Sequence, residues 1–338
     1  MSESDPYSRL SAAAGREWPA LEAARARAGD FRIRLENAIS PLINPEDLSV
    51  VVFGSLARGE LTSGSDTDWT LLLDGQASPD QTSVMRDVTN AIAGLERKEP
   101  GREATFGVLA SSHELLHNIG GGADTNRNLT QRILLLLESA AVGPGEVRAR
   151  VVSGVLSRYI SEDPGWENKS VLVPRFLLND ISRYWRTVAV DFAYKRRERN
   201  SEGWAIRTVK LRLSRKLTFA SGLLACFSCA LEPSLRDEGD RSLRVIEHLT
   251  GVLALTPLER TAALLVDAGL GDAAARIFDA YGEFLEMMDD PRFARSWRRS
   301  FPSRRNRTSP SGGAGRWGTV SRRRWTECSS IRRVPSRS

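Results

Sequence analysis

The chain contains a Gly-Ser pair, Gly54-Ser55, which is followed after ten residues by two acidic residues, Asp66 and Asp68. Residues two apart on a strand project from the same face, so the two carboxylates would lie side by side and repel each other. A divalent cation relieves that repulsion, and Mg²⁺, or Mn²⁺ in its place, takes one or two carboxylates together with water and phosphate oxygens. The spacing therefore predicts a metal site formed by Asp66 and Asp68.

Two buried strands are expected to position these residues. Residues 48–53 and 67–73 are short apolar runs, and the first of them ends directly at Gly54. A glycine after a strand allows a tight turn, and the amide N–H groups that follow the turn favour phosphate. Gly54 and Ser55 are therefore the predicted contacts to the phosphates of a nucleotide.

The order Gly-Ser, ten residues, Asp-x-Asp resembles the signature of the DNA polymerase β-like nucleotidyltransferase superfamily. Residues 57–61, Ala-Arg-Gly-Glu-Leu, also look similar to a segment of the bacterial PII-uridylyltransferases and their relatives. The resemblance implies an enzyme that transfers a nucleoside monophosphate from a nucleoside triphosphate to an acceptor hydroxyl and releases pyrophosphate. The alternative for the same residues is a hairpin with an acidic, solvated turn.

A third acidic residue usually completes the site in the family that the chain resembles. Two candidates follow the paired aspartates, Glu103 beside the apolar run 104–110 and Asp124 before a leucine-rich segment. Each has a structural alternative, because Glu103 suits a charged surface loop and Asp124 suits the N-cap of a helix. We favour the structural interpretation of both.

The second half of the chain is predicted to be helical, because apolar residues recur every three or four positions from Glu146 onward. Residues 204–216 form a basic helix with Arg207, Lys210 and Ser214 on one side. The resemblance implies that Lys210 and Ser214 hold the incoming nucleotide. A solvated basic face is the alternative.

The C-terminal residues 291–338 contain 14 Arg and one acidic residue, Glu327. This tail therefore carries a net charge of +13, and since the whole chain carries +6, the remainder carries −7. Its polar, glycine-rich composition predicts disorder. An arm that contacts nucleic acid is one interpretation of the tail, and a non-functional extension is the other.

The segment His113-Glu-Leu-Leu-His117 matches the His-Glu-x-x-His pattern of zinc hydrolases. Such a helix must continue behind its ligands, but residues 118–122, Asn-Ile-Gly-Gly-Gly, end it at once. We therefore expect a short helix that packs through Leu115, Leu116 and Ile119, and a zinc hydrolase is a remote alternative.

The predicted fold class is α+β, with a small mixed-sheet nucleotidyltransferase core followed by an α-helical bundle and a disordered basic tail. The expected division is a helical segment at 1–30, the catalytic domain at 31–145, the helical domain at 146–290 and the tail at 291–338. With no apolar leader and no run long enough to span a membrane, the chain is expected to be cytoplasmic.

The predicted function is a Mg²⁺-dependent nucleotidyltransferase. Its acceptor is a protein side chain, a nucleotide or oligonucleotide, or a small hydroxylated molecule, and the sequence does not distinguish them. The alternative from a different class is a nucleotide-sensing module of the same fold with weak or no catalysis, since no third carboxylate is assigned.

Overall fold

A four-stranded sheet with the strand order β3-β2-β1-β4 lies among the helices of the computed structural model, which describes residues 5–95, 106–163, 172–198, 204–236 and 240–290. The strands are β1 (Leu48–Phe53), β2 (Trp69–Leu73), β3 (Val108–Ser111) and β4 (Ser139–Val142). Strand β1 is antiparallel to both β2 and β4, whereas β2 and β3 are parallel. The mixed sheet followed by many helices confirms the predicted α+β class.

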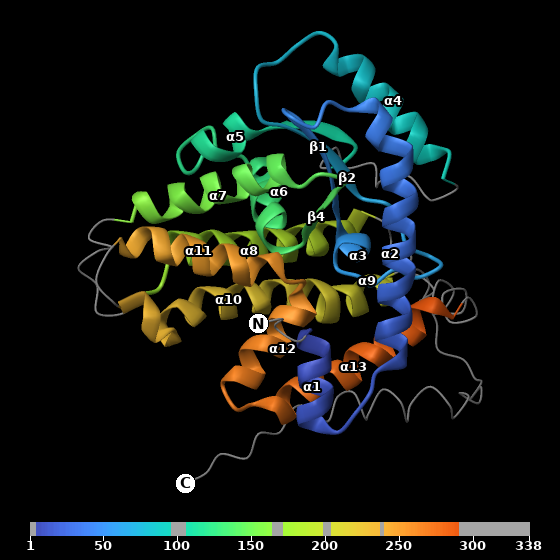
Figure 1. The fold of residues 1–338 in the computed structure, drawn as a ribbon. Helices are drawn as coiled ribbons and strands as arrows, with labels where there is room; N and C mark the ends of the chain where they lie inside the picture. Colours follow the sequence, from blue (N-terminus) through green and yellow to red (C-terminus); the bar gives the residue numbers. More distant parts are fainter. Residues whose placement is uncertain (1–4, 96–105, 164–171, 199–203, 237–239, 291–338) are drawn as a thin grey trace, which may run out of the picture. The chain divides into compact units, whose positions relative to one another are not determined.

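Strand β1 is buried along its whole length because both faces of the sheet are covered. Val50 and Val52 belong to one apolar cluster, with α2 and α4, while Val51 and Phe53 belong to another, with α5, α6 and α7 (Figure 1). These helices are α2 (Pro19–Ile39), α3 (Gly54–Ala57), α4 (Gln81–Ala93), α5 (Ser112–His117), α6 (Asn126–Leu137) and α7 (Glu146–Ser161). A strand covered on both faces reads as a continuous apolar run, as this one does.

The remaining helices follow the sheet in sequence, except for α1. They are α1 (Pro6–Ala14), α8 (Arg175–Glu198), α9 (Trp204–Lys210), α10 (Lys216–Leu231), α11 (Arg241–Ala254), α12 (Pro257–Asp267) and α13 (Gly271–Asp289), with short 3₁₀ helices at Ser40–Leu42 and Pro233–Arg236. A π-helical turn, Leu211–Arg215, joins α9 to α10. Helix α12 begins with a capping box in which Thr256 and Glu259 exchange hydrogen bonds with each other's backbone N–H groups.

One buried cation ties the sheet side of the molecule to the helical part. Arg260 on α12 is fully buried and donates to the backbone carbonyls of Leu137, at the end of α6, and of Val252 and Leu255 near the end of α11. It also donates to the hydroxyl of Ser221 on α10 at 3.0 Å. Carbonyls at helix ends have no partner within their own helix, so this guanidinium supplies one.

The described residues all lie within one compact unit, residues 1–301. The expected boundary between residues 30 and 31 falls inside α2. The division into a helical segment and a catalytic domain stays a prediction. The tail and Glu103 lie outside the described residues.

No single helix in the described part of the chain could cross a membrane. Helices α11 and α12 pass the length and composition criteria only as a pair, and this pair is bent by 118°.

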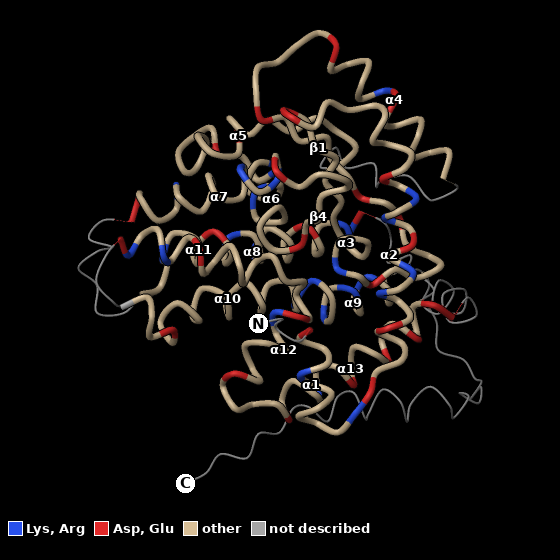
Figure 2. Tube along the Cα trace, viewed as in Figure 1, with Lys and Arg blue, Asp and Glu red and all other residues tan. Residues whose placement is uncertain are grey.

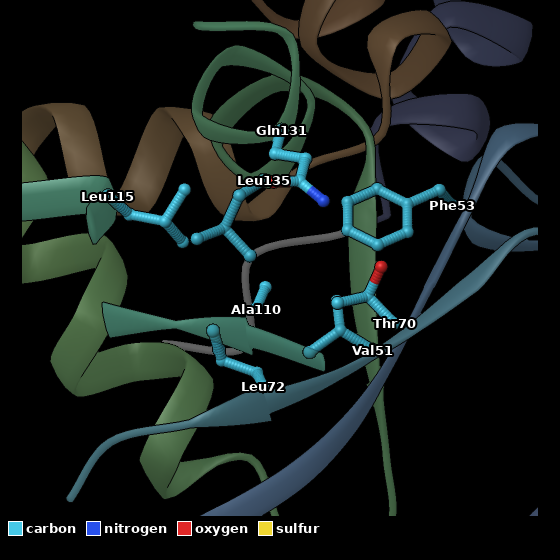
Figure 3. A pocket seen from close by; sticks show the side chains of 8 residues that line it. All are labelled: Val51, Phe53, Thr70, Leu72, Ala110, Leu115, Gln131 and Leu135. Carbon is cyan, nitrogen blue, oxygen red and sulfur yellow. The ribbon is translucent and has the colours of Figure 1, made fainter. Parts of the chain in front are cut away.

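A small cavity of about 10 Å³ lies between the sheet and α6. Figure 3 shows Thr70 and Gln131 reaching into this space from opposite walls, while apolar residues such as Leu72 and Leu135 line the rest. The Thr70 hydroxyl is buried without a hydrogen-bond partner among the described residues. A space of this size holds a water molecule at most, so it is no substrate site.

Candidate functional site

The chain turns sharply where β1 ends. Gly54 has a φ of +64°, a conformation that L side chains rarely adopt, and it opens the four-residue helix α3. The Arg58 N–H donates to the Gly54 carbonyl at 3.0 Å, and the Glu60 N–H donates to the Ser55 carbonyl at 2.8 Å. The predicted turn after the first strand is therefore present, and Ser55 within it is half-buried.

Asp66 and Asp68 lie just before the second strand, which begins at Trp69. The backbone carbonyl of Asp68 accepts a hydrogen bond from the Phe53 N–H at 2.9 Å, which fixes Asp68 beside the end of β1. A Cβ atom built on Gly54 would lie 3.1 Å from Oδ2 of Asp68, so the carboxylate faces the turn directly. The structure thus brings Gly54 and Asp68 together as the sequence predicted.

The charge environment of Asp66 and Asp68 is set by neighbouring acidic and basic groups and not by a direct ion pair. Neither forms a salt bridge with a Lys or Arg among the described residues. Burial, together with the negative charges of Asp66 and Glu138, raises the pKa of the Asp68 carboxyl to about 7, against the opposing effects of Arg215 and Arg58. This is the environment that a bound cation relieves.

Two exposed cations come from the helical part of the chain. Lys210 at the end of α9 has its pKa lowered by desolvation, while Asp66 and Asp68 act in the opposite direction. Arg215, at the end of the π-helical turn, is close enough to Asp68 to lower the pKa of that carboxyl. Figure 2 shows basic residues of this segment beside α3. Lys210 and Arg215 therefore place positive charge near Asp66 and Asp68.

Ser214 lies in different surroundings from Lys210. Its hydroxyl is buried and accepts a hydrogen bond from Nη2 of Arg58 at 3.2 Å, whereas Lys210 is exposed. Regular helical spacing predicts both on one side of a helix. The π-helical turn changes the residue spacing between them, because it holds more residues per turn than an α-helix.

Glu138 is a carboxylate that the sequence analysis did not assign to this site. It stands between α6 and β4, and its Oε2 accepts hydrogen bonds from Nη1 of Arg58 and from the hydroxyl of Thr218, both at 2.8 Å. Its charge raises the pKa of Asp68, which places it close to the aspartate pair. The only signal in the sequence was a glutamate that ends a leucine-rich helix.

Asp124 occupies a different polar cluster. Its carboxylate is buried and accepts hydrogen bonds from Arg132 at 3.2 Å and from Arg183 at 2.5 Å. The N-cap of α6 is Thr125, whose hydroxyl accepts from the Asn128 N–H, so the expected capping role of Asp124 belongs to its neighbour. Two arginines bind the Asp124 carboxylate, which leaves it poorly suited to a metal. Glu103, the other candidate, lies outside the described residues.

The His-Glu-x-x-His segment forms the six-residue helix α5, which ends at His117. The rings of His113 and His117 are exposed and 4.7 Å apart, while Leu115 packs into the core. Among the described residues, no group of three or more His, Cys, Asp or Glu side chains could hold a metal ion. The burial of Leu115 agrees with the expectation of a short helix that packs through its apolar residues.

The donor set at Asp66 and Asp68 fits Mg²⁺. This ion accepts one or two carboxylates and completes its octahedral shell with water and substrate phosphates, so it does not require a third protein ligand. Desolvation is the main cause of the raised pKa of Asp68, and the negative charges of Asp66 and Glu138 add to it. Those two neighbouring charges favour a bound cation once the Asp68 carboxyl has lost its proton.

Comparison with known families agrees with this geometry. Residues 34–98 match the nucleotidyltransferase domain. The match confirms the predicted resemblance to the polymerase β-like nucleotidyltransferases for this segment, which includes Gly54, Ser55, Asp66 and Asp68. The closer resemblance to the PII-uridylyltransferase group is not confirmed. No curated protein shows significant similarity to the chain. The nucleotidyltransferase domain supports transfer of a nucleoside monophosphate in general terms.

Proposed function

We propose that the protein transfers a nucleoside monophosphate from a nucleoside triphosphate to an acceptor hydroxyl in a Mg²⁺- or Mn²⁺-dependent reaction. The observation that carries the proposal is the Asp68 carboxylate, which faces the Gly54 turn from within 3.1 Å of a Cβ atom built there. In this site Asp66 and Asp68 would hold the metal, and the Gly54-Ser55 turn would admit the triphosphate.

The acceptor oxygen would form a bond to the α-phosphorus while the bond between that phosphorus and the oxygen leading to the β-phosphate breaks. Lys210 and Arg215 would contact the negative triphosphate and the departing pyrophosphate. A bound Mg²⁺ supplies neutralisation of phosphate charge and makes the acceptor hydroxyl more acidic. The protein's own contribution would be position, with Asp66, Asp68, Lys210 and Arg215 arranged around the Gly54-Ser55 turn.

The test uses ATP, CTP, GTP and UTP, each labelled at the α-phosphorus, with Mg²⁺ or Mn²⁺. Asp66→Ala and Asp68→Ala should each abolish transfer and leave the circular dichroism spectrum unchanged. Asp74→Ala is the matched control, because Asp74 follows the far end of β2 and pairs with Arg150 at 2.9 Å. Transfer that persists in the Asp66→Ala/Asp68→Ala double variant would reject the proposal.

The acceptor is either a protein side chain or a nucleotide or oligonucleotide. The same assay separates them, since the label appears either on a protein band or on an extended oligonucleotide. Contact of the Arg-rich tail with nucleic acid would favour the second acceptor, and removal of residues 296–338 should then weaken transfer in a salt-dependent way.

A nucleotide-sensing module without catalysis is the second candidate. It is favoured by the lack, within the described residues, of a three-carboxylate group that could hold a metal. Nucleotide binding that depends on Asp68, combined with no transfer to any acceptor, is the result that would select it.

A further inference from the structure

Arg58 lies at the centre of a buried polar cluster. Its three guanidinium nitrogens donate in three directions: Nε to Oε2 of Glu60 at 2.8 Å, Nη1 to Oε2 of Glu138 at 2.8 Å, and Nη2 to the hydroxyl of Ser214 at 3.2 Å. The Arg58 side chain is 9% exposed and those of Glu60 and Glu138 are 3% and 10% exposed. The residues that meet here are up to 156 positions apart in sequence.

Burial of this cluster carries a cost in stability. Charges removed from water are tolerated only with partners, and a well-packed apolar core of the same volume is often at least as stable as a buried ion pair. The cluster also holds two carboxylates for one guanidinium, so it does not neutralise itself. These observations point to a role in geometry rather than in stability.

Arg58 and two of its partners, Glu138 and Ser214, lie in three different parts of the site. Arg58 itself closes the Gly54 turn through its N–H, which donates to the Gly54 carbonyl. Glu138 precedes Ser139, whose partner on β1 is Phe53, the residue before that turn. Ser214 lies in the π-helical turn between Lys210 and Arg215. One arginine therefore connects the turn, the Glu138 carboxylate whose charge acts on Asp68, and the segment that carries both cations.

We propose that Arg58 is a positioning residue for nucleotidyl transfer. It holds Glu138 beside Asp68 and fixes the π-helical turn so that Lys210 and Arg215 face the aspartates. The proposal rests on the proposed function. A planar guanidinium with five donors can hold partners on three sides, and a lysine ammonium at the same place cannot reproduce that fork.

Two variants weaken the cluster without leaving a carboxylate buried opposite an apolar residue. Arg58→Lys keeps the charge and loses the fork, and Ser214→Ala removes the link to the helical part. Arg260 and Ser221 supply matched controls. Both are buried, and Arg260 donates to the Ser221 hydroxyl at 3.0 Å. Arg260 has no carboxylate hydrogen-bond partner among the described residues. Arg260→Lys and Ser221→Ala should cost similar stability and leave the site geometry intact.

The measurements are the melting temperature, kcat and KM for the triphosphate, and Mn²⁺ affinity by electron paramagnetic resonance, which requires no turnover. We expect Arg58→Lys to lower kcat about 10- to 100-fold and to weaken Mn²⁺ binding about tenfold, as changes behind a metal ligand do. Ser214→Ala should lower kcat about tenfold, since a small displacement of catalytic groups has effects of this size. The kcat of a variant with both changes should be little lower than that of Arg58→Lys alone, because both changes break the same contact between Arg58 and Ser214.

Three results would overturn the proposal. The first is that the kcat and the Mn²⁺ affinity of Arg58→Lys lie within about twofold of those of Arg260→Lys, when both variants are measured below their melting temperatures. Another is a higher KM with unchanged kcat in Ser214→Ala alone, which would mean that Ser214 contacts the nucleotide directly. The third is full additivity of the two changes. These results differ from a failure of the proposed function itself. If the proposed function were wrong, Asp68→Ala would retain transfer. If only the role of Arg58 were wrong, Asp68→Ala would still be inactive.

Discussion

Gly54 and Asp68 approach each other so closely that a methyl group on the glycine would lie 3.1 Å from Oδ2 of the aspartate. The contact is tighter than an ordinary van der Waals contact, and the backbone of Gly54 is in the left-handed region, with φ at +64°. The glycine therefore serves two purposes, because it makes the turn after β1 and leaves room for the carboxylate.

Gly54→Ala should lower transfer by about 10- to 100-fold, because Asp68 must move away from the new methyl group and small displacements of reacting groups have effects of this size. The free energy of unfolding should fall by about 1 to 2 kcal/mol from backbone strain. Gly15→Ala is the control, since Gly15 has a φ of +62° and no atoms within 4 Å of its added Cβ. Equal activity losses in both variants would contradict the role given to the Gly54 contact.

The raised pKa of Asp68 predicts a pH-dependent stability. Between the ordinary value of 3.8 and about 7, the folded protein binds more protons at this position than the unfolded chain does, so stability falls as pH rises through that range. Asp68→Asn removes this loss. We compare the free energy of unfolding of Asp68→Asn with that of the unsubstituted protein at each pH. The difference between the two proteins should favour the variant by about 1 to 3 kcal/mol more at pH 8 than at pH 4. Urea titrations across this range measure it, and a pH-independent difference would contradict the raised pKa.

Metal affinity should depend on the same proton. Because burial raises the pKa of Asp68 to about 7, a cation must displace a proton below that pH. Mn²⁺ affinity measured by electron paramagnetic resonance should rise about tenfold between pH 6 and pH 8. Asp68→Asn should bind Mn²⁺ weakly and with a flat pH profile. A steep profile that survives this substitution would assign the proton to another group.

Arg132 should be essential for stability rather than for transfer. Its guanidinium is fully buried and contacts Asp124 at 3.2 Å, Asp180 at 2.8 Å and the Tyr159 hydroxyl at 2.7 Å. Arg132→Met leaves two carboxylates without their main partner and should cost about 3 to 5 kcal/mol in the free energy of unfolding. Arg86→Met, at an exposed position, should change it by no more than about 0.5 kcal/mol. A loss below about 1 kcal/mol in Arg132→Met would show that the cluster relaxes freely.

The two exposed cations should act on nucleotide binding. Lys210→Ala and Arg215→Ala should each raise KM for the triphosphate about tenfold, with a smaller effect at high salt, because each removes one charge that faces the phosphates. Lys195→Ala provides the comparison, since Lys195 is paired with Asp191 at 2.6 Å. If the Lys210 and Arg215 variants match Lys195→Ala in steady-state kinetics, the triphosphate lies elsewhere.

The strands that flank the motif were predictable because local sequence and burial agree there. Residues 48–53 form an unbroken run of mainly apolar residues that stops at Gly54, and the structure has β1 over the same residues. The second strand begins at Trp69, two residues later than expected. Asp68 lies outside the strand, beside the Gly54 turn. Both clusters of the core draw on alternate residues of these strands.

Strand β4 was not predicted, because Ser139-Ala-Ala-Val142 has little of the β-branched or aromatic character that marks a strand. It is a strand through its pairing with β1, a long-range contact that no local pattern reports. For the same reason the neighbouring Glu138 was missed. Its partner Arg58 lies 80 residues earlier, and sequence spacing alone does not bring the two together.

The placement of Ser214 and Asp124 also depended on contacts far away in sequence. A regular helix over 204–216 put Ser214 on the side of Lys210, but a π-helical turn directs its hydroxyl toward Arg58. Asp124 fitted an N-cap by residue type, yet Arg132 and Arg183 bind its carboxylate and Thr125 caps the helix. In both cases a buried arginine outweighs the local preference.

Arg260 gives the molecule a property that the matched segment alone would lack. Its guanidinium is shared between the carbonyl that ends α6 and those near the end of α11, so a residue of the helical half satisfies a polar group of the first half. A gene fragment that encoded only the strands and their immediate helices would leave the Leu137 carbonyl without this donor. Recombination between relatives should therefore transmit the two halves together, and neither is expected to be exchanged as an independent cassette.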